Sequence, residues 1–203
     1  MSKLPNITTS IFSKMSLLAQ EYKAINLSQG FPDFPIDFKL KDLISQKIEE
    51  DTHQYCPASG HPDLLEGIAR IVKQSYQRDT NIEKEILITA GATQAIFTTI
   101  QAIVHAGDEV IILDPSYDCY VAPILLCNAK PVRVSLDQNF MPDWDLIEKH
   151  ISHKTKLIIT NNPHNPSGRT WAHRDMNQLE RIMSKYRKLH LLSDEVYEFI
   201  TFE

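Results

Sequence analysis

The chain has 203 residues, with 21 Lys and Arg side chains against 26 Asp and Glu, and a formal net charge of −5. Its apolar fraction of 42% is ordinary for a globular protein, and this mild acidity offers no basic stripe to a nucleic-acid partner. The longest nearly unbroken apolar stretch, residues 120–127, is far shorter than the about 20 residues that cross a bilayer, so we expect no membrane partner.

The cysteines and the N-terminus indicate the compartment. Cys56, Cys119 and Cys127 are odd in number and form no CxxC pair, which is typical of free thiols in a reducing environment. The first residues lack the apolar run of a signal peptide. We therefore expect a cytoplasmic protein.

The first part of the chain is divided into short elements. Apolar side chains at helical spacing predict a helix that carries Ile11, Met15, Leu18 and Tyr22. A second amphipathic stretch covers residues 38–48, and Pro62 stands at a plausible first-turn position of a third helix.

From residue 85 onward short apolar runs alternate with helical patterns. The predicted strands are residues 86–89, 110–113, 131–134, 157–160 and 189–193. The predicted helices between them are residues 92–104, 117–126, 144–151 and 174–187. Strands of this kind predict an α/β fold, a mostly parallel sheet with helices on both faces. Ligands of such sheets bind at the carboxyl ends of the strands.

The loops after the first two predicted strands offer an anion site and an aromatic ring. Gly91 stands between a strand and a helix, where backbone N–H groups can approach an anion at the positive helix end. Neither a P-loop nor a GxGxxG pattern is present, and a tight connecting turn is the alternative. Tyr117 follows the next strand and could stack on a planar ligand, although an aromatic residue there is more often part of the core.

The loops after the last two predicted strands offer an amide and a carboxylate. The run NNPHNPSG covers residues 161–168, where Pro166 keeps Asn165 out of helical geometry. The run SDEVY covers residues 193–197, and an acid such as Asp194 at the end of an apolar strand requires a positive partner. The alternatives are an elaborate turn and a capping Asp. Together, the loops suit a flat, phosphorylated, heteroaromatic cation such as pyridoxal phosphate.

These residues resemble those of the class I/II aminotransferases, which depend on pyridoxal 5′-phosphate and share the aspartate aminotransferase fold. The resemblance rests on NPHNPSG and SDEVY, on their separation by one helix, and on QGFPDF at 29–34, QY at 54–55 and DPSY at 114–117. The combination is most similar to the branch acting on methionine, glutamine and aromatic amino acids, including kynurenine. It implies the fold type I large domain, incomplete at its C-terminus. We expect residues 1–45 to form an N-terminal arm and part of the small domain, and residues 46–203 the first part of the large domain.

The resemblance implies the residues that hold the cofactor ring. Asp194 would pair with the protonated pyridine nitrogen, and Asn165 and Tyr197 would hydrogen-bond the 3-oxygen of the ring. Tyr117 would stack on the ring face, and Asn161 would line the pocket. By this reasoning Asp194 and Tyr197 are the catalytic residues present.

The resemblance also implies contacts to the phosphate and the substrate. Backbone groups of Gly91, Ala92 and Thr93 would hold the phosphate, and Tyr55 would reach the phosphate bound by the neighbouring subunit of a homodimer. The N–H of Gly30 would approach the substrate carboxylate, and Asn165 would also contact the substrate. The partners implied are an amino acid and a 2-oxo acid.

One family feature has no counterpart in the chain. The Schiff-base lysine lies downstream of the Asp-x-x-Tyr segment in this family, and the substrate-binding arginine lies later still. Candidates such as Lys185 and Lys188 fall on an amphipathic helix and are interpreted as surface charges. We expect the chain to be the first half of an aminotransferase, inactive alone, with an unpaired strand edge near residues 189–193.

Other functions remain open. A pyridoxal-phosphate-dependent carbon–sulfur lyase would use the same ring-holding residues, and a non-catalytic aminotransferase-like binding or dimerisation module would explain the missing lysine. A metal site is disfavoured, because His150 and His153 share no ligand spacing with His164 or the cysteines. We expect no metal.

Overall fold

The computed structural model describes residues 2–5, 7–30, 34–51 and 54–200. By its contacts the chain divides into two compact units, one of Thr9–Thr89 and one of Met1–Thr8 with Ala90–Glu203. Phe31, Pro32 and Asp33 of the QGFPDF motif lie outside the described residues, and the predicted domain boundary at 45/46 stays a prediction.

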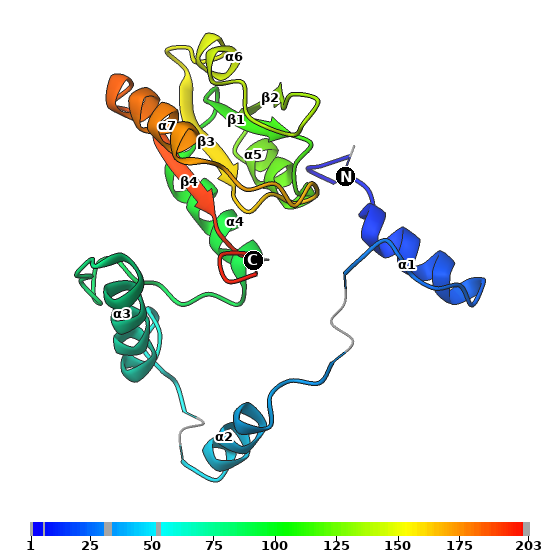
Figure 1. Cartoon of the computed structure of the whole chain (residues 1–203), viewed down its shortest axis with the longest axis vertical. Coiled ribbons are helices and arrows are strands. Elements are labelled where there is room, and N and C mark those ends of the chain that lie inside the picture. Colours follow the sequence, from blue (N-terminus) through cyan, green and yellow to red (C-terminus); the bar gives the residue numbers. More distant parts are fainter. Residues whose placement is uncertain (1, 6, 31–33, 52–53, 201–203) are drawn as a thin grey trace. The chain divides into compact units, whose positions relative to one another are not determined.

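The described residues of the Thr9–Thr89 unit form three helices, all expected from the sequence. They are α1 (Ile11–Glu21), α2 (Phe38–Ile48) and α3 (Pro62–Tyr76) (Figure 1). The side chain of Asp37 accepts a hydrogen bond from the Lys39 backbone N–H at 2.7 Å and so caps α2. Pro62 occupies the first turn of α3, where its missing N–H costs no helical hydrogen bond.

The second unit is built on a parallel four-stranded sheet in the order β2-β1-β3-β4. The strands are β1 (Glu109–Asp114), β2 (Lys130–Ser135), β3 (Thr155–Asn161) and β4 (His190–Asp194). They confirm four of the five predicted strands. Because all four run in one direction, their carboxyl ends and the loops that leave them lie at the same edge of the sheet.

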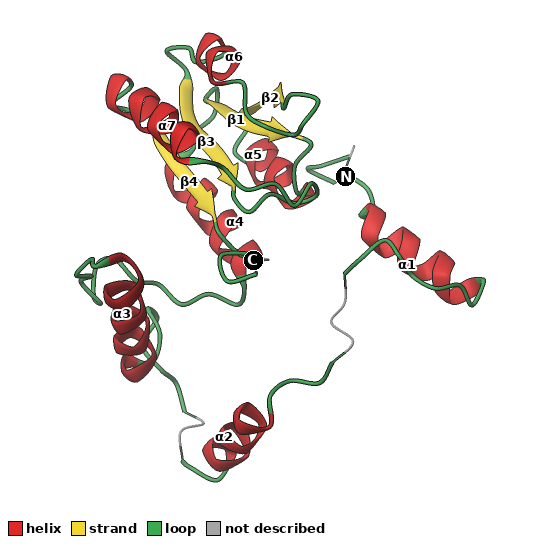
Figure 2. Cartoon of the chain, in the orientation of Figure 1, coloured by secondary structure: helices red, strands yellow, loops and turns green. Residues whose placement is uncertain are grey.

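Helices cover both faces of this sheet (Figure 2). One face packs against α4 (Ala92–Ile103), α5 (Val121–Leu126) and the short 3-10 helix η1 (Asp118–Tyr120). The strand residues of this core are Val110, Ile112, Leu157 and Ile159.

The opposite face packs against α6 (Trp144–Lys149) and α7 (His173–Lys185). The alternate strand residues, Ile111, Leu113 and Ile158, belong to this second core. The alternation of faces from one residue to the next is the period of two expected of strands, and the central strands β1 and β3 are buried on both faces. The fold is therefore α/β with a parallel sheet and helices on both faces, as predicted.

Two predictions about local structure were wrong. Residues 86–89 form no strand, because no strand among the described residues pairs with them; the Ile88 N–H instead donates to the Ser59 carbonyl at 2.8 Å. The helix predicted for residues 117–126 begins only after Tyr117, whose φ of −61° and ψ of 139° are extended, and its first turn is η1.

β4 lies at one edge of the sheet, and no strand of the described ranges pairs with its outer side, as expected. Within those ranges, no helix is both long and apolar enough to cross a membrane.

The core predicts the effect of truncating Leu157, which is fully buried in β3, compared with Leu191, which is 38% exposed in β4. Leu157→Ala should lower the free energy of unfolding by about 2–5 kcal/mol, since it removes buried contacts and leaves a cavity. Leu191→Ala, the matched control, should cost less than half as much. Urea denaturation followed by circular dichroism measures both; equal losses would contradict the assigned core.

Candidate active site

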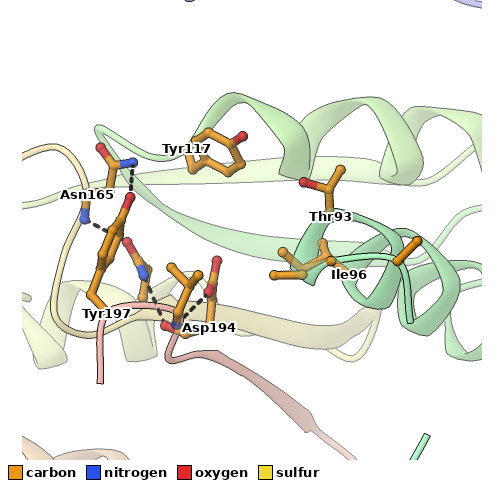
Figure 3. A pocket seen from close by; sticks show the side chains of 11 residues that line it. Thr93, Ile96, Tyr117, Asn165, Asp194 and Tyr197 are labelled. Atoms are coloured by element: carbon orange, nitrogen blue, oxygen red, sulfur yellow. Dashed lines mark hydrogen bonds between the residues drawn. The ribbon is translucent and has the colours of Figure 1, made fainter. Parts of the chain in front are cut away.

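A cavity of about 300 Å³ opens at the carboxyl edge of the sheet. It is bounded by the loops after β1, β3 and β4 and by the start of α4 (Figure 3). The residues that line it are Ala90, Gly91, Ala92, Thr93, Ile96, Tyr117, Asn161, Asn165, Asp194, Val196 and Tyr197. Eight of them are residues that the sequence singled out for the cofactor: Gly91, Ala92, Thr93, Tyr117, Asn161, Asn165, Asp194 and Tyr197.

Asp194 supplies a buried negative charge to this cavity. Asp194 is the last residue of β4 and is only 8% exposed. Its Oδ2 accepts a hydrogen bond from the Tyr120 hydroxyl at 2.6 Å, and its Oδ1 accepts one from the Val196 N–H at 3.3 Å. None of the ion pairs among the described residues includes Asp194. A buried carboxylate is costly unless a positive group meets it, so this site favours a cationic ligand.

Hydrogen bonds tie the ends of β3 and β4 to the proline-rich loop. Asn161 lies opposite Asp194 in the sheet register, and its Nδ2 donates to the Asp194 backbone carbonyl at 3.0 Å. The Oδ1 of Asn161 accepts from the Asn165 backbone N–H at 2.7 Å. The Nδ2 of Asn165 donates to the Tyr197 hydroxyl at 3.0 Å (Figure 3). The amide and the phenol that the sequence suggested are therefore in direct contact.

The first turn of α4 forms another wall of the cavity, with Ala92 and Thr93 in its lining. Gly91, the residue before the helix, has a φ of 86°, a backbone conformation that side chains rarely tolerate. The N-terminus of a helix carries a partial positive charge and favours anions. The walls of the cavity thus include both a helix N-terminus that favours anions and a carboxylate.

Tyr117 gives the cavity an aromatic side chain. Figure 3 shows Asn165 and Tyr197 on one side of the cavity and Thr93 on the other, with Tyr117 and Asp194 between them. Burial is the main reason that the pKa of Tyr117 is raised, and the nearby Cys119 and Asp118 add to the effect. The Tyr117 hydroxyl is therefore neutral near pH 7.

His164 joins two of the loops around the cavity. Its ring is buried, with Nε2 3.0 Å from the Pro115 carbonyl and Nδ1 2.7 Å from the Ser167 hydroxyl. Because a carbonyl only accepts, Nε2 carries the proton and Nδ1 accepts from Ser167. Burial lowers the pKa of His164 below its usual value, so the neutral ring is the folded form.

Sequence reasoning missed Tyr120. The residue stands three positions after Tyr117, a helical spacing that is typical of core aromatics, and it is indeed buried in the core at 2% exposure. Its contact with Asp194 joins residues 74 positions apart, so no local pattern signals it.

Gly30 and Tyr55 belong to the Thr9–Thr89 unit and do not line the cavity. A Cβ added at Gly30 would meet no atom within 4 Å, and Tyr55 is fully exposed. Their predicted contacts to substrate and to a neighbouring subunit stay predictions.

Comparison with known proteins now decides the family. The family model described as aminotransferase class I and II matches residues 22–203. The chain belongs to this family. Aminotransferases of this family depend on pyridoxal phosphate, act on amino acids and 2-oxo acids, and are typically dimers.

The relatives of this aminotransferase chain include enzymes of two substrate types. It is 41% identical over 202 residues to the methionine aminotransferase of Escherichia coli K12, covering 99% of this chain and 52% of that protein. It is 33% identical over 212 residues to human kynurenine–oxoglutarate transaminase 3, covering 98% of this chain and 46% of that protein. The chain spans about half the length of the curated relatives it matches.

A solved structure confirms the fold. The N-succinyldiaminopimelate aminotransferase from Mycobacterium tuberculosis superposes with a TM-score of 0.93 at 32% identity, covering 100% of this chain and 53% of that one. The α/β architecture described above is therefore the aminotransferase fold of type I over the part that this chain covers.

The cavity residues fit the family's cofactor. The unpaired charge of Asp194 suits a protonated pyridine nitrogen, and the start of α4 suits a phosphate.

In the part of the chain that the structure describes, no group of three or more His, Cys, Asp or Glu side chains is placed to hold a metal ion.

The lowered pKa of His164 predicts a pH dependence of stability. The unfolded chain takes up a proton at this ring below about pH 6.5, whereas the folded chain resists it, so acidification through that pH lowers the free energy of unfolding until the folded ring also titrates. His164→Gln keeps a donor and an acceptor and should lose this component of the acid destabilisation. Urea denaturation at about pH 7.5 and 5.5 measures the difference.

His153→Gln, at an exposed position, is the matched control for that experiment and should retain the wild-type pH dependence. A His164→Gln chain that loses as much stability on acidification as the wild type would contradict the prediction.

Proposed function

We propose that this chain is the cofactor-holding part of a pyridoxal-phosphate-dependent aminotransferase, which transfers an amino group from an amino acid to a 2-oxo acid. The observation that carries the proposal is Asp194, a buried carboxylate that lines a cavity and takes part in none of the ion pairs of the described residues. Its surroundings leave a place for one cation, and a protonated pyridine ring is such a cation.

Each cavity residue has a defined task in this proposal. Asp194 would accept a hydrogen bond from the ring nitrogen and keep that nitrogen protonated, while Asn165 and Tyr197, which contact each other, would hydrogen-bond the 3-oxygen. Tyr117 stacks on the ring, and Asn161 holds the loop and the strand end in register. When bound, the cofactor supplies an electron sink for the electron pair released at the substrate's α-carbon.

The start of α4 would hold the phosphate of the cofactor. Gly91, Ala92 and Thr93 line this end of the cavity, where their backbone groups would hold the phosphate, and the helix dipole favours the negative charge. Tyr55, fully exposed in its own unit, reaches the phosphate of the neighbouring subunit in a homodimer, which the family resemblance supports.

We propose a substrate of the methionine, glutamine or aromatic type, kynurenine included. The similarity to a methionine aminotransferase and to a kynurenine–oxoglutarate transaminase supports this range. The N–H of Gly30 approaches the substrate carboxylate, and Asn165 contacts the substrate as well as the ring.

No lysine is among the described residues that line the cavity, which supports the proposal that the Schiff-base lysine is not in this chain. That lysine moves a proton at the reacting carbon in the family, a type of catalysis worth about 10²–10⁴-fold.

The 203-residue chain alone should therefore show no transaminase turnover. The test incubates purified chain with pyridoxal phosphate, methionine or glutamine, and a 2-oxo acid, and follows the keto product by mass spectrometry. A mixture without protein corrects for the slow reaction of the free cofactor. Sustained product formation above that background would overturn this part of the proposal.

Asp194→Asn tests the ion pair directly. The probe is pyridoxamine 5′-phosphate, which carries the same ring and phosphate but forms no Schiff base with surface lysines. Loss of the carboxylate should weaken its binding roughly tenfold or more, since a tenfold change corresponds to about 1.4 kcal/mol and buried charge pairs are typically worth more. Isothermal titration calorimetry measures the affinity.

Asp114→Asn is the matched control, because Asp114 also ends a strand at the same edge of the sheet but does not line the cavity. Its affinity should stay at the wild-type value. If Asp194→Asn binds the probe as tightly as the wild type does, the assigned ion pair is wrong.

A further inference from the structure

A short hydrogen bond between Tyr120 and Asp194 connects the core to the cavity. The Tyr120 hydroxyl lies 2.6 Å from Oδ2 of Asp194, whereas the Val196 N–H lies 3.3 Å from Oδ1. Tyr120 comes from η1 and Asp194 from the end of β4, so the bond joins a covering helix to an edge strand.

The Tyr120 ring is fixed by its packing. It is 2% exposed and belongs to the core that contains Ile100 and Ile124, both fully buried. Its hydroxyl therefore has little freedom to move away from Asp194. A buried donor of this kind sets the position of the group that it contacts.

Tyr120 is not one of the residues that line the cavity, so it does not touch a ligand there and acts only through Asp194. An ionised carboxylate has about four acceptor sites, of which Tyr120 and Val196 use two. Acceptor capacity thus remains for a donor in the cavity.

The direction of the hydrogen bond is settled by chemistry. Burial and the neighbouring Asp194 raise the pKa of Tyr120, so the phenol keeps its proton and donates it. Burial and the same carboxylate raise the pKa of the adjacent Cys119 thiol to about 12, which keeps that group neutral as well. Tyr120 is therefore the donor and Asp194 the acceptor of this hydrogen bond.

We propose that Tyr120 is the positioning residue of Asp194, whose hydroxyl holds the carboxylate in place and stabilises its ionised form for the ring nitrogen of the cofactor. This inference rests on the proposed function of Asp194 and deepens it. Without the hydroxyl, the carboxylate turns more freely and its charged form loses a hydrogen-bond donor. Its interaction with the protonated ring nitrogen is therefore weaker.

The test uses pyridoxamine 5′-phosphate labelled with ¹⁵N in the ring and bound to the 203-residue chain. The ¹⁵N chemical shift of a pyridine distinguishes the protonated from the neutral nitrogen. In Tyr120→Phe the shift should move from the protonated value towards the neutral one, and the affinity should fall roughly threefold to tenfold. Phe keeps the buried ring, and circular dichroism checks the fold.

Tyr186→Phe is the matched control, because the Tyr186 hydroxyl also faces a carboxylate, Glu148 at 3.4 Å, away from the cavity. Its ¹⁵N shift and affinity should equal those of the wild type. An unchanged ¹⁵N shift in Tyr120→Phe would overturn the inference.

Asp194→Asn separates the two hypotheses. If Asp194→Asn changes the ¹⁵N shift and Tyr120→Phe does not, the role of Tyr120 is wrong and the proposed function stands. If Asp194→Asn leaves both shift and affinity unchanged, the proposed function itself is wrong, and the inference falls with it.

A second measurement needs no substitution in the core. With Tyr120 unchanged and the chain labelled with 3-fluorotyrosine, one buried ¹⁹F resonance should differ between the wild type and Asp194→Asn, since that ring loses its charged acceptor. If no buried resonance moves, the Tyr120–Asp194 bond is refuted in the chain without ligand.

Discussion

The backbone carbonyl of Asp194 is the point at which β3, β4 and the proline-rich loop are joined. It accepts hydrogen bonds from the Asn161 side chain at 3.0 Å and from the Asn162 N–H at 3.2 Å. The same Asn161 side chain holds the backbone of Asn165. A parallel sheet brings its carboxyl ends together, but only such side-chain bonds set the positions of the loops to a fraction of an ångström.

The electrostatics of the cavity follow from this arrangement. Once the end of β4 is fixed, the carboxylate of Asp194 is confined between the core, through Tyr120, and the cavity. The start of α4 brings the opposite preference, for an anion, to the same lining. A ligand that carries a ring cation and a phosphate satisfies both at once, and this complementarity makes the site more specific than any one of its residues.

The sequence predicted the sheet largely because its central strands, β1 and β3, are buried on both faces and appear as short apolar runs. Residues 86–89 have the same composition and yet form no strand, because a strand also requires a neighbour and none is present among the described residues. An apolar composition indicates that a segment is buried, whereas the pairing of strands depends on contacts with residues that are distant in the sequence.

The residues of the candidate site likewise fall into those that local sequence patterns predict and those that they do not. Gly91, Asn165 and Asp194 stand at loop positions whose chemistry is visible locally, and the structure brings all three to one cavity. Tyr120 was missed because its local pattern is that of a core residue and its partner lies 74 positions away. The contacts proposed for Gly30 and Tyr55 would involve surfaces beyond their own unit, so neither sequence spacing nor the fold of that unit determines them.

Within the described residues β4 has a sheet neighbour on one side only, and its last residue is Asp194, which we propose meets the cation of the ligand. Edge strands open more readily than central ones, and a ligand that binds only the closed form adds its binding free energy to the closed form. Filling the cavity therefore protects the edge of the sheet from local opening. In a cell short of the cofactor, β4 would therefore open more often and be more accessible to proteases.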